Sequence, residues 1–257
     1  MSDRVNIAID GHVAVITLNR PDKHNAVDLA MFAALADAGE QLASNRTVRA
    51  IVLRGAGPSF CAGIDISIFR PGAGVDAEKL APGAASPANF FQRAAYIWRE
   101  VPVPVLAALH GSVFGAGLQI ALGADLRYAT PQCRLSVMEI KWGIIPDMAI
   151  STTLPHLMPT DKIKELAWTG RVVNGDEALA LGILTGLHAD PYAAALETAN
   201  LIAKKAPSAV HAIKRLFDAS TGLDSARPAT LYAITGFWNP LSAIVPTDSA
   251  WTRSFTK

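Results

Sequence analysis

The stretch of sequence that decides the fold runs from Val103 to Ala129 and reads VPVLAALHGSVFGAGLQIALGADLRYA. Its first part, Val103–Leu109, is a continuous apolar run of the kind found in strands that are buried on both faces of a parallel sheet. Glycines and small residues follow, and the segment Gly115–Gly123 then predicts a helix rich in small side chains. Leu126–Ala129 predicts another short strand. This order of strand, turn, helix and strand indicates an α/β fold.

The same stretch raises the question of a membrane span, because Val101–Ala124 has no charged residue and is long enough to cross a bilayer. Two prolines and four glycines interrupt it, so we expect a folded core instead of a span. The first ten residues, MSDRVNIAID, lack the apolar segment of a secretory signal. Cys61 and Cys133 give neither a disulfide framework nor a metal-binding spacing. The sequence therefore predicts a cytoplasmic protein with two buried thiols and no metal site.

Composition narrows the class of protein further. Of the 257 residues, 51% are apolar and 18% are charged, against about 25% charged in an average globular domain. A disordered chain is excluded, since it needs much charge and few apolar groups. The net charge of +1 and the lack of long Lys/Arg runs argue against a nucleic-acid partner. The excess of apolar residues favours subunit interfaces or a buried apolar site.

Before this stretch, the sequence predicts a hairpin, a helix and a second buried strand. Val5–Ile9 and Val13–Leu18 flank Asp10-Gly11, which favours a type I′ turn with positive φ at both central residues. Asp28 is placed to cap a helix, and Ala50–Leu53 is another apolar run. The remaining expected elements are a loop over residues 71–88, a helix over Asn89–Glu100, a strand over Arg134–Val137, and helices near 148–157, 161–169, 175–182, 191–205 and 207–220.

Two loops that contain glycine follow the two buried strands. They are Phe60–Asp65 (FCAGID) and His110–Gln119 (HGSVFGAGLQ). Glycine lets the backbone approach a ligand closely, and the N–H groups at a helix N-terminus favour negative charge. Two such loops that converge would form a backbone oxyanion hole. The alternative is that the glycines serve only close packing of strand against helix.

The segment Gly115–Ile120 (GAGLQI) also suggests the glycine turn of a dinucleotide-binding unit. Ile120 occupies the third glycine position, and the preceding strand is not the first strand of the chain. We therefore disfavour a dinucleotide site. Walker A, HExxH and GxSxG motifs are absent from the sequence.

Two carboxyl groups lie in apolar surroundings. Burial of Glu139 or Asp147 would raise its pKa toward the range in which a general acid or base works near neutrality. Each also has a simpler interpretation: a salt bridge between Glu139 and Lys141, and a helix cap at Asp147 after Pro146, which the sequence alone favours. Asp65 and Asp125 each end an apolar segment and are expected to be structural caps.

Together these motifs resemble the crotonase (enoyl-CoA hydratase/isomerase) superfamily. The resemblance covers about residues 5–220 and rests on Leu18–Ala26 (LNRPDKHNA), Phe60–Asp65, Gly111–Gln119, Gly123–Arg127 (GADLR), Thr169–Arg171 and Glu177–Leu184 (EALALGIL). It implies an α/β crotonase-like spiral of ββα units over residues 1–190, which bind acyl-CoA and carry catalysis. Residues 191–257 would form a C-terminal helical trimerisation region, in a homotrimer or a dimer of trimers. Beyond about residue 225 the chain departs from the charged final helix that is usual in the family.

The resemblance also implies roles for single residues. The backbone N–H groups of Ile64 and Ala116 would form the oxyanion hole for an acyl-CoA thioester. Coenzyme A is then part of the substrate, and no separate cofactor is expected. The residues expected to contact the substrate are Ala26, Ala62, Gly63, Asp65, Ile66, Phe69, Phe114, Gly115, Gly117 and Trp142.

The catalytic acids depart from the hydratases of the family, which use two glutamates. Gln119 stands at the first of these positions and Glu139 at the second, and an amide cannot take a proton from water. Asp147, eight residues after Glu139, resembles the acid of the dienoyl-CoA isomerase branch. The leading prediction is therefore an isomerase of enoyl- or dienoyl-CoA with Glu139 and Asp147 as its acid/base pair. The alternatives are a hydratase that uses Glu139 and a water held by Gln119, and a non-catalytic acyl-CoA-binding oligomer.

Overall fold

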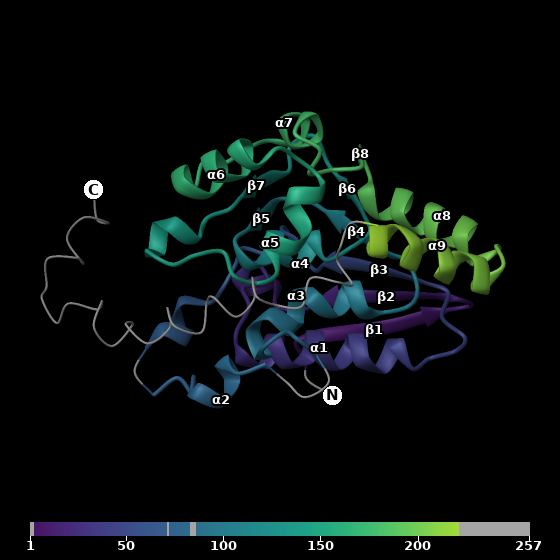
Figure 1. Ribbon diagram of the computed structural model, residues 1–257, viewed down its shortest axis with the longest axis horizontal. Helices are drawn as coiled ribbons and strands as arrows, with labels where there is room; N and C mark the ends of the chain where they lie inside the picture. Colours follow the sequence, from purple (N-terminus) through teal and green to yellow (C-terminus); the bar gives the residue numbers. More distant parts are fainter. Residues whose placement is uncertain (1–2, 71, 83–85, 221–257) are drawn as a thin grey trace, which may run out of the picture.

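The structure, a computed structural model, describes residues 3–70, 72–82 and 86–220 (Figure 1). The strands in these ranges are β1 (Val5–Asp10), β2 (Val13–Leu18), β3 (Ala50–Gly55), β4 (Val105–Leu109), β5 (Ser112–Phe114), β6 (Leu126–Ala129), β7 (Arg134–Ser136) and β8 (Gly186–Leu187). The α-helices are α1 (Leu29–Ala43), α2 (Ala77–Leu80), α3 (Phe90–Glu100), α4 (Ala116–Leu122), α5 (Ile150–Thr153), α6 (Thr160–Thr169), α7 (Gly175–Ala180), α8 (Pro191–Ala203) and α9 (Pro207–Ser220). Short 3₁₀ helices are η1 (Pro21–Lys23), η2 (Ile66–Phe69), η3 (Glu139–Trp142) and η4 (Leu154–His156).

The main sheet has the strand order β1-β2-β3-β4-β6-β8. Strand β1 is antiparallel to β2, and the other neighbours are parallel. Strands β5 and β7 form a separate parallel pair. A repeating unit is visible along the chain, because β1 and β2 are followed by α1, and β4 and β5 by α4. The loops that follow β2, β3 and β4 all leave the same edge of the sheet, where the carboxyl ends of parallel strands gather.

Helices cover both faces of the main sheet. On one face, α1 and α3 pack together, and the rings of Phe32 and Phe91 lie 5.1 Å apart between their centroids. On the other, Ala195, Ala199 and Ala203 of α8 meet the sheet, and these small side chains, spaced by one helical turn, let the helix approach closely. The first helix of the predicted C-terminal region thus shares the packing of the sheet. Its predicted role in oligomerisation stays a prediction, and residues 221–257 lie outside the described residues.

The hairpin of β1 and β2 forms as predicted, but its turn is different. Asp10 pairs with Val13, so the loop residues are Gly11 and His12. Gly11 has φ 55°, whereas His12 is not among the described residues with positive φ. The type I′ prediction is therefore wrong, since that turn needs positive φ at both central residues.

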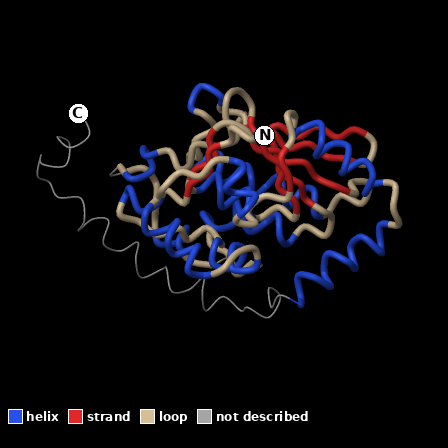
Figure 2. The backbone as a smooth tube through the Cα atoms, turned by 90° about the horizontal axis from the view of Figure 1, so that it is seen from above, coloured by secondary structure: helices blue, strands red, loops and turns tan. Residues whose placement is uncertain are grey.

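The last described helix, α9, lies on the outside of the molecule (Figure 2) and is held by the buried Lys214 and by an ion pair between Asp218 and Arg99. Lys214 Nζ donates hydrogen bonds to the carbonyl oxygens of Trp98 and Val103, both at 3.1 Å, and to Asp125 Oδ2 at 2.9 Å. Asp125 also accepts a hydrogen bond from the N–H of Val105 at the start of β4. This confirms its predicted structural role.

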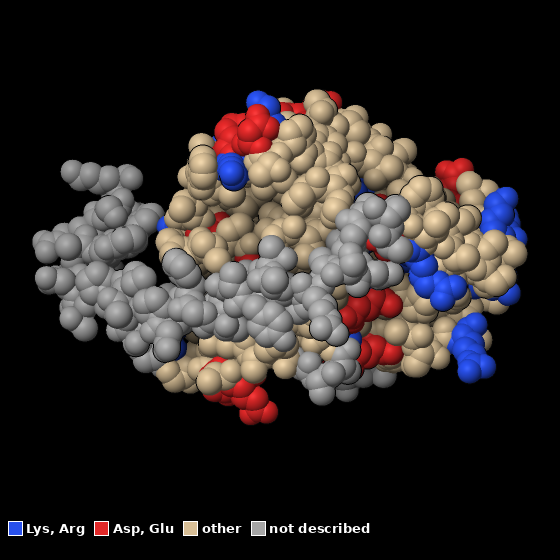
Figure 3. Space-filling model, in the orientation of Figure 1, with Lys and Arg blue, Asp and Glu red and all other residues tan. Residues whose placement is uncertain are grey.

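The apolar stretch Val101–Ala124 is divided between β4, β5 and α4. Among the described residues, no helix is both long enough and apolar enough to cross a membrane. Cys61 and Cys133 are buried free thiols, as predicted. On the face seen in Figure 3, basic and acidic side chains form small separate groups on a surface that is otherwise uncharged, which reflects the low share of charged residues.

Candidate active site

The two predicted glycine loops lie side by side. Cys61 forms a parallel bridge with Val113 of β5, in which its N–H donates to Ser112 O at 3.1 Å and its carbonyl accepts from Phe114 N at 3.0 Å. On its other side, the same segment pairs with the turn after β2, because Val27 bridges to Ile64. The loop 60–65 is therefore held between two chain segments that are remote from it in sequence.

Glycines make this close approach possible, so the packing interpretation is also correct in part. A Cβ on Gly117 would lie 2.6 Å from Cys61 Cβ. Gly63 has φ 104°, and a Cβ there would lie 3.1 Å from Phe114 O. Any larger residue at Gly117 would push the two loops apart.

The two N–H groups predicted for the oxyanion hole have no partner within the described residues. Val27 N donates to Gly63 O at 2.8 Å and Val27 O accepts from Asp65 N at 3.0 Å. In a parallel bridge of this kind the N–H of the central residue, Ile64, points to the opposite side of the segment, where β5 lies. Ala116 is the first residue of α4, and its N–H is one of those that a helix leaves without an internal partner. A backbone oxyanion hole requires two such unpaired N–H groups, and the role of Ile64 and Ala116 as its donors stays a prediction.

Glu139 lies next to this pair of loops and is buried, with an exposed fraction of 5%. Its Oε1 accepts a hydrogen bond from Gln119 Nε2 at 2.6 Å and lies 3.3 Å from the position of a Cβ on Gly115. Burial raises the pKa of Glu139 to about 7; the bond from Gln119 lowers this pKa and the charge of Asp147 raises it. Among the described residues, Glu139 Oε2 and Gln119 Oε1 are buried without a hydrogen-bond partner. The site thus holds a buried acid with one oxygen available for proton transfer.

The structure rejects the simpler interpretations of both acids. Glu139 bonds to Gln119, while Lys141 is exposed and forms no ion pair with Glu139 among the described residues. Asp147 does not cap α5, because that helix begins at Ile150 after Ala149, which has φ 68° and serves as the N-cap without a side-chain bond. Asp147 is half-buried and lies close enough to Glu139 for its charge to act on the pKa.

The predicted substrate-contacting residues divide by exposure. Ile66 and Trp142 are 51% and 53% exposed. Asp65 is engaged in structure, since it accepts from Ser67 N at 2.9 Å and from Arg20 Nη1 at 2.7 Å. Partial burial acts to raise the pKa of Asp65, but the hydrogen bonds from Ser67 and Arg20 outweigh it and lower this pKa to about 2. The others are buried or half-buried around the two loops, and their contacts with substrate stay predictions: Ala26, Ala62, Gly63, Phe69, Phe114, Gly115 and Gly117.

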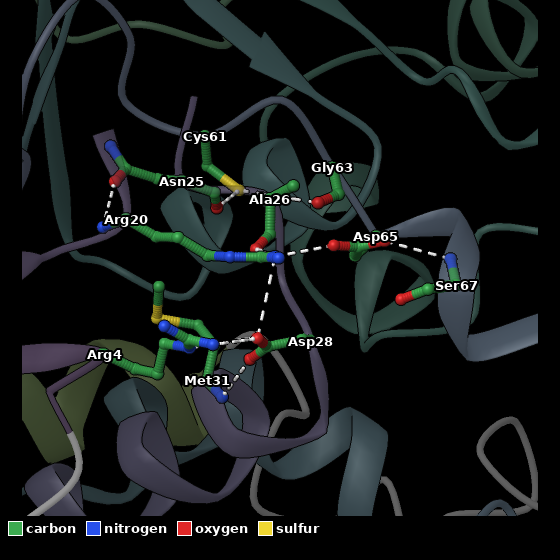
Figure 4. A network of polar contacts seen from close by, with 10 residues as sticks. All are labelled: Arg4, Arg20, Asn25, Ala26, Asp28, Met31, Cys61, Gly63, Asp65 and Ser67. Atoms are coloured by element: carbon green, nitrogen blue, oxygen red, sulfur yellow. Dashed lines mark hydrogen bonds and ion pairs between the residues drawn. The ribbon is translucent and has the colours of Figure 1, made fainter. Parts of the chain in front are cut away.

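Sequence reasoning missed the polar network that anchors the loop 60–65 (Figure 4). Asn25 is completely buried, and its side chain bonds to four backbone groups. A signal was present in the sequence, because Asn in a turn after a strand often adopts the left-handed conformation that Asn25 has here.

Comparisons with known proteins show which family this chain belongs to. The sequence matches the model of the enoyl-CoA hydratase/isomerase family over residues 8–235. The mitochondrial Δ(3,5)-Δ(2,4)-dienoyl-CoA isomerase of Mus musculus is 30% identical over 212 residues, which are 79% of this chain and 64% of the mouse protein. The carnitinyl-CoA dehydratase of Proteus mirabilis is 31% identical over 226 residues, 87% of this chain and 83% of that protein. A crystal structure of an enoyl-CoA hydratase/isomerase from Mycobacterium paratuberculosis superposes with a TM-score of 0.80 at 27% identity, covering 92% of each chain.

The fold and the two loops define a crotonase-type enzyme that acts on acyl-CoA. The chain belongs to the enoyl-CoA hydratase/isomerase family, as the sequence motifs predicted. The predicted α/β crotonase-like fold is thereby confirmed. The relatives include both an isomerase and a dehydratase, so the reaction has to be argued from the residues of this chain.

Proposed function

We propose that this enzyme is an isomerase that shifts double bonds in enoyl-CoA or 3,5-dienoyl-CoA thioesters, with Glu139 and Asp147 as its acid/base pair. The observation that carries the proposal is the pairing of Glu139 with Gln119 of α4 instead of with a second carboxylate. In this pair Glu139 has a pKa of about 7 and keeps one oxygen without a partner among the described residues. A two-glutamate activation of water is therefore missing, while a carboxyl group fit for proton transfer is in place.

The proposed reaction moves one proton and adds no atom. The N–H groups of Ile64 and Ala116 donate to the thioester oxygen, which makes the carbon next to the carbonyl more acidic. One carboxylate of the pair removes a proton there, and the electron pair becomes part of a conjugated enolate. The other carboxyl group, in its acid form, returns a proton at the far end of the conjugated system, and the double bonds shift. The substrate brings its own coenzyme A, and we propose that no further cofactor takes part.

A near-neutral pKa suits this task. A group that alternates between acid and base works best when both forms are populated at the working pH. The bond from Gln119 stabilises the ionised form of Glu139, and the charge of Asp147 opposes it. An ionised Asp147 therefore favours the protonated form of Glu139.

Hydration of a 2-enoyl-CoA is the second candidate, and one observation favours it. Gln119 Oε1 and Glu139 Oε2 are both buried and unpartnered, and two such acceptors can hold one water molecule that donates to each. Glu139 would then take the proton of that water.

Incubation with 2-enoyl-CoA and, separately, with 3,5-dienoyl-CoA tests the proposal. The readouts are the gain in absorbance of a 2,4-diene conjugated to the thioester for the dienoyl substrate, and the loss of absorbance of the conjugated enoyl thioester for 2-enoyl-CoA. We expect the dienoyl substrate to be converted rapidly and Asp147→Asn to lose this activity. Fast hydration that survives in Asp147→Asn would contradict the isomerase and support the hydratase. Tight binding of both CoA esters without turnover would support the binding protein instead.

We also propose that the enzyme is a homotrimer or a dimer of trimers. The apolar side chains of Ile213, Leu216 and Phe217 on α9 are exposed in the single chain, and a partner subunit would cover them. Analytical ultracentrifugation distinguishes a monomer from three or six subunits.

A further inference from the structure

We infer that Asn25 is a positioning residue that aims the Ile64 N–H at the thioester oxygen, by fixing the loop 60–65 to the turn after β2. The inference rests on the proposed role of Ile64 in the oxyanion hole. It concerns a residue that does not itself touch the substrate, the reacting atoms or either carboxyl group.

The first step is the backbone of the turn. His24 and Asn25 are consecutive residues in the left-handed region, with φ 49° and 56°. This conformation is unfavourable for residues other than glycine and persists only where the surroundings enforce it. It turns the Asn25 side chain into the protein, where it is completely buried.

The second step is the side chain, which uses its donors and its acceptor at once. Asn25 Nδ2 donates to the carbonyl oxygens of Ala56, Ser59 and Phe60, at 2.9, 2.8 and 3.1 Å. Asn25 Oδ1 accepts from Arg20 N at 2.8 Å. The Asn25 amide therefore links the segment just after β2 to residues 56–60, which lead from β3 into the loop 60–65.

The third step is a row of backbone contacts that links the turn to the loop as far as Ile64. The carbonyl of Asn25 accepts from Cys61 Sγ at 3.1 Å, and that of His24 accepts from Ala62 N at 2.9 Å. The bridge between Val27 and Ile64 follows directly, so the turn runs alongside the loop over several residues.

Arg20 secures the far end of the same loop. Its Nη1 donates to Ala26 O at 2.9 Å and to Asp65 Oδ2 at 2.7 Å (Figure 4). Ile64 thus lies between two anchors, Asn25 before it and Arg20 after it, and both belong to one turn. The direction of the Ile64 N–H follows from this turn because the loop itself has no regular secondary structure before η2.

The test uses a saturated acyl-CoA with a ¹³C-labelled thioester carbonyl, bound to the full-length protein and observed by infrared spectroscopy. A saturated chain has no double bond to move, so the readout does not depend on turnover. Asn25→Asp has nearly the same shape and still accepts from Arg20, but it loses the donors to the three carbonyls. Asn25→Gly is the second variant, because glycine keeps the left-handed turn without strain if the aspartate variant fails to fold. Asn89→Ala is the matched control, since Asn89 is also buried but caps α3.

We expect the wild type and Asn89→Ala to lower the carbonyl frequency by the same amount, and both Asn25 variants to lose more than half of that shift. In turnover, Asn25→Asp should lower kcat about 10- to 100-fold, as for a misplaced oxyanion donor, with KM changed less than about threefold. Asn25 variants that keep the full shift and lose only thermal stability would overturn the inference. A full shift in the wild type without any double-bond movement would contradict the proposed function and leave the role of Asn25 standing.

Discussion

Gln119 Nε2 lies 2.6 Å from Glu139 Oε1 and joins the first turns of α4 to the 3₁₀ helix η3. The bond uses one oxygen of the carboxyl group and leaves Oε2 without a partner among the described residues. An amide at position 119 can orient Glu139 by this hydrogen bond, but it cannot itself accept a proton as a general base. The chemistry of the site therefore depends on what else can exchange protons with Glu139, and Asp147 is the acid whose charge acts on it.

Replacing Glu139 itself is the simplest prediction. Glu139→Gln keeps the shape of the side chain and removes its proton chemistry, so we expect double-bond isomerisation to fall about 10²- to 10⁴-fold. The affinity for a saturated acyl-CoA, measured by calorimetry, should change little. An active Glu139→Gln variant would exclude this residue from the acid/base pair.

Gln119→Glu should increase the hydration of 2-enoyl-CoA. Two carboxyl groups within hydrogen-bond distance share one proton, which restores the pair of acids that family hydratases use. We expect the hydration rate of 2-enoyl-CoA to rise at least about tenfold, with Gln119→Met, which can neither donate nor accept strongly, as the control. If both variants hydrate at the wild-type rate, Gln119 does not limit hydration.

Glu139 should also make stability depend on pH. Its pKa rises from an ordinary 4.5 to about 7 on folding, mainly through burial, so the folded protein binds the proton more tightly than the unfolded chain. The stabilisation is complete below pH 4.5 and is lost as the pH rises through about 7. Glu139→Gln avoids this loss and should be more stable than the wild type by up to about 3 kcal/mol at pH 8.5, but not at pH 4.

Urea unfolding at the two pH values measures this difference. Glu165→Gln serves as a control, since Glu165 has a pKa lowered by its bond with Arg171 and therefore the opposite sign. A stability difference for Glu139→Gln that does not change with pH would show that the carboxyl group titrates alike in both states.

Gly115→Ala tests the contact between α4 and Glu139. Gly115 has φ 51°, and a Cβ there would lie 3.3 Å from Glu139 Oε1. Gly143 also has a positive φ, 67°, but its ψ is 21°, against −119° at Gly115, and it has open space around its Cβ position. We expect Gly115→Ala to lower kcat at least about tenfold more than Gly143→Ala, because Gly143 is in the milder left-handed region with open space, whereas the new methyl group at Gly115 also presses on Glu139.

Lys214→Met should loosen α9. The ammonium group is buried and bonds to two carbonyls and Asp125, and breaking a buried ion pair by removing one partner costs about 3 to 5 kcal/mol. Limited proteolysis should then cleave at α9 much earlier than in the wild type. Equal cleavage rates would show that α9 is held by contacts other than this lysine.

The sequence predicts the elements around β4 and α4 well, because an apolar run, glycines and a small-residue helix are local signals. It also identifies the glycine loops after β3 and β4, and in the structure they meet because both follow parallel strands at one edge of the sheet. The three-residue strand β5 escapes prediction, because its pairing with β7 depends on tertiary structure.

Two features of the site also escape local reasoning. The contacts of Asn25 join residues more than 30 positions apart, and no periodicity reports them. The helix cap expected at Asp147 fails because Ala149 takes a left-handed conformation and delays the start of α5 to Ile150.

The central claim is that this enzyme moves double bonds, and mass spectrometry of the product tests it most directly. The purified enzyme is given 3,5-dienoyl-CoA or 2-enoyl-CoA, and the mass and double-bond position of each product are determined. The account predicts a 2,4-dienoyl product of unchanged mass from the first substrate, formed by the wild type and not by Glu139→Gln. Unchanged 3,5-dienoyl-CoA, together with rapid gain of one water by the 2-enoyl-CoA, would contradict it.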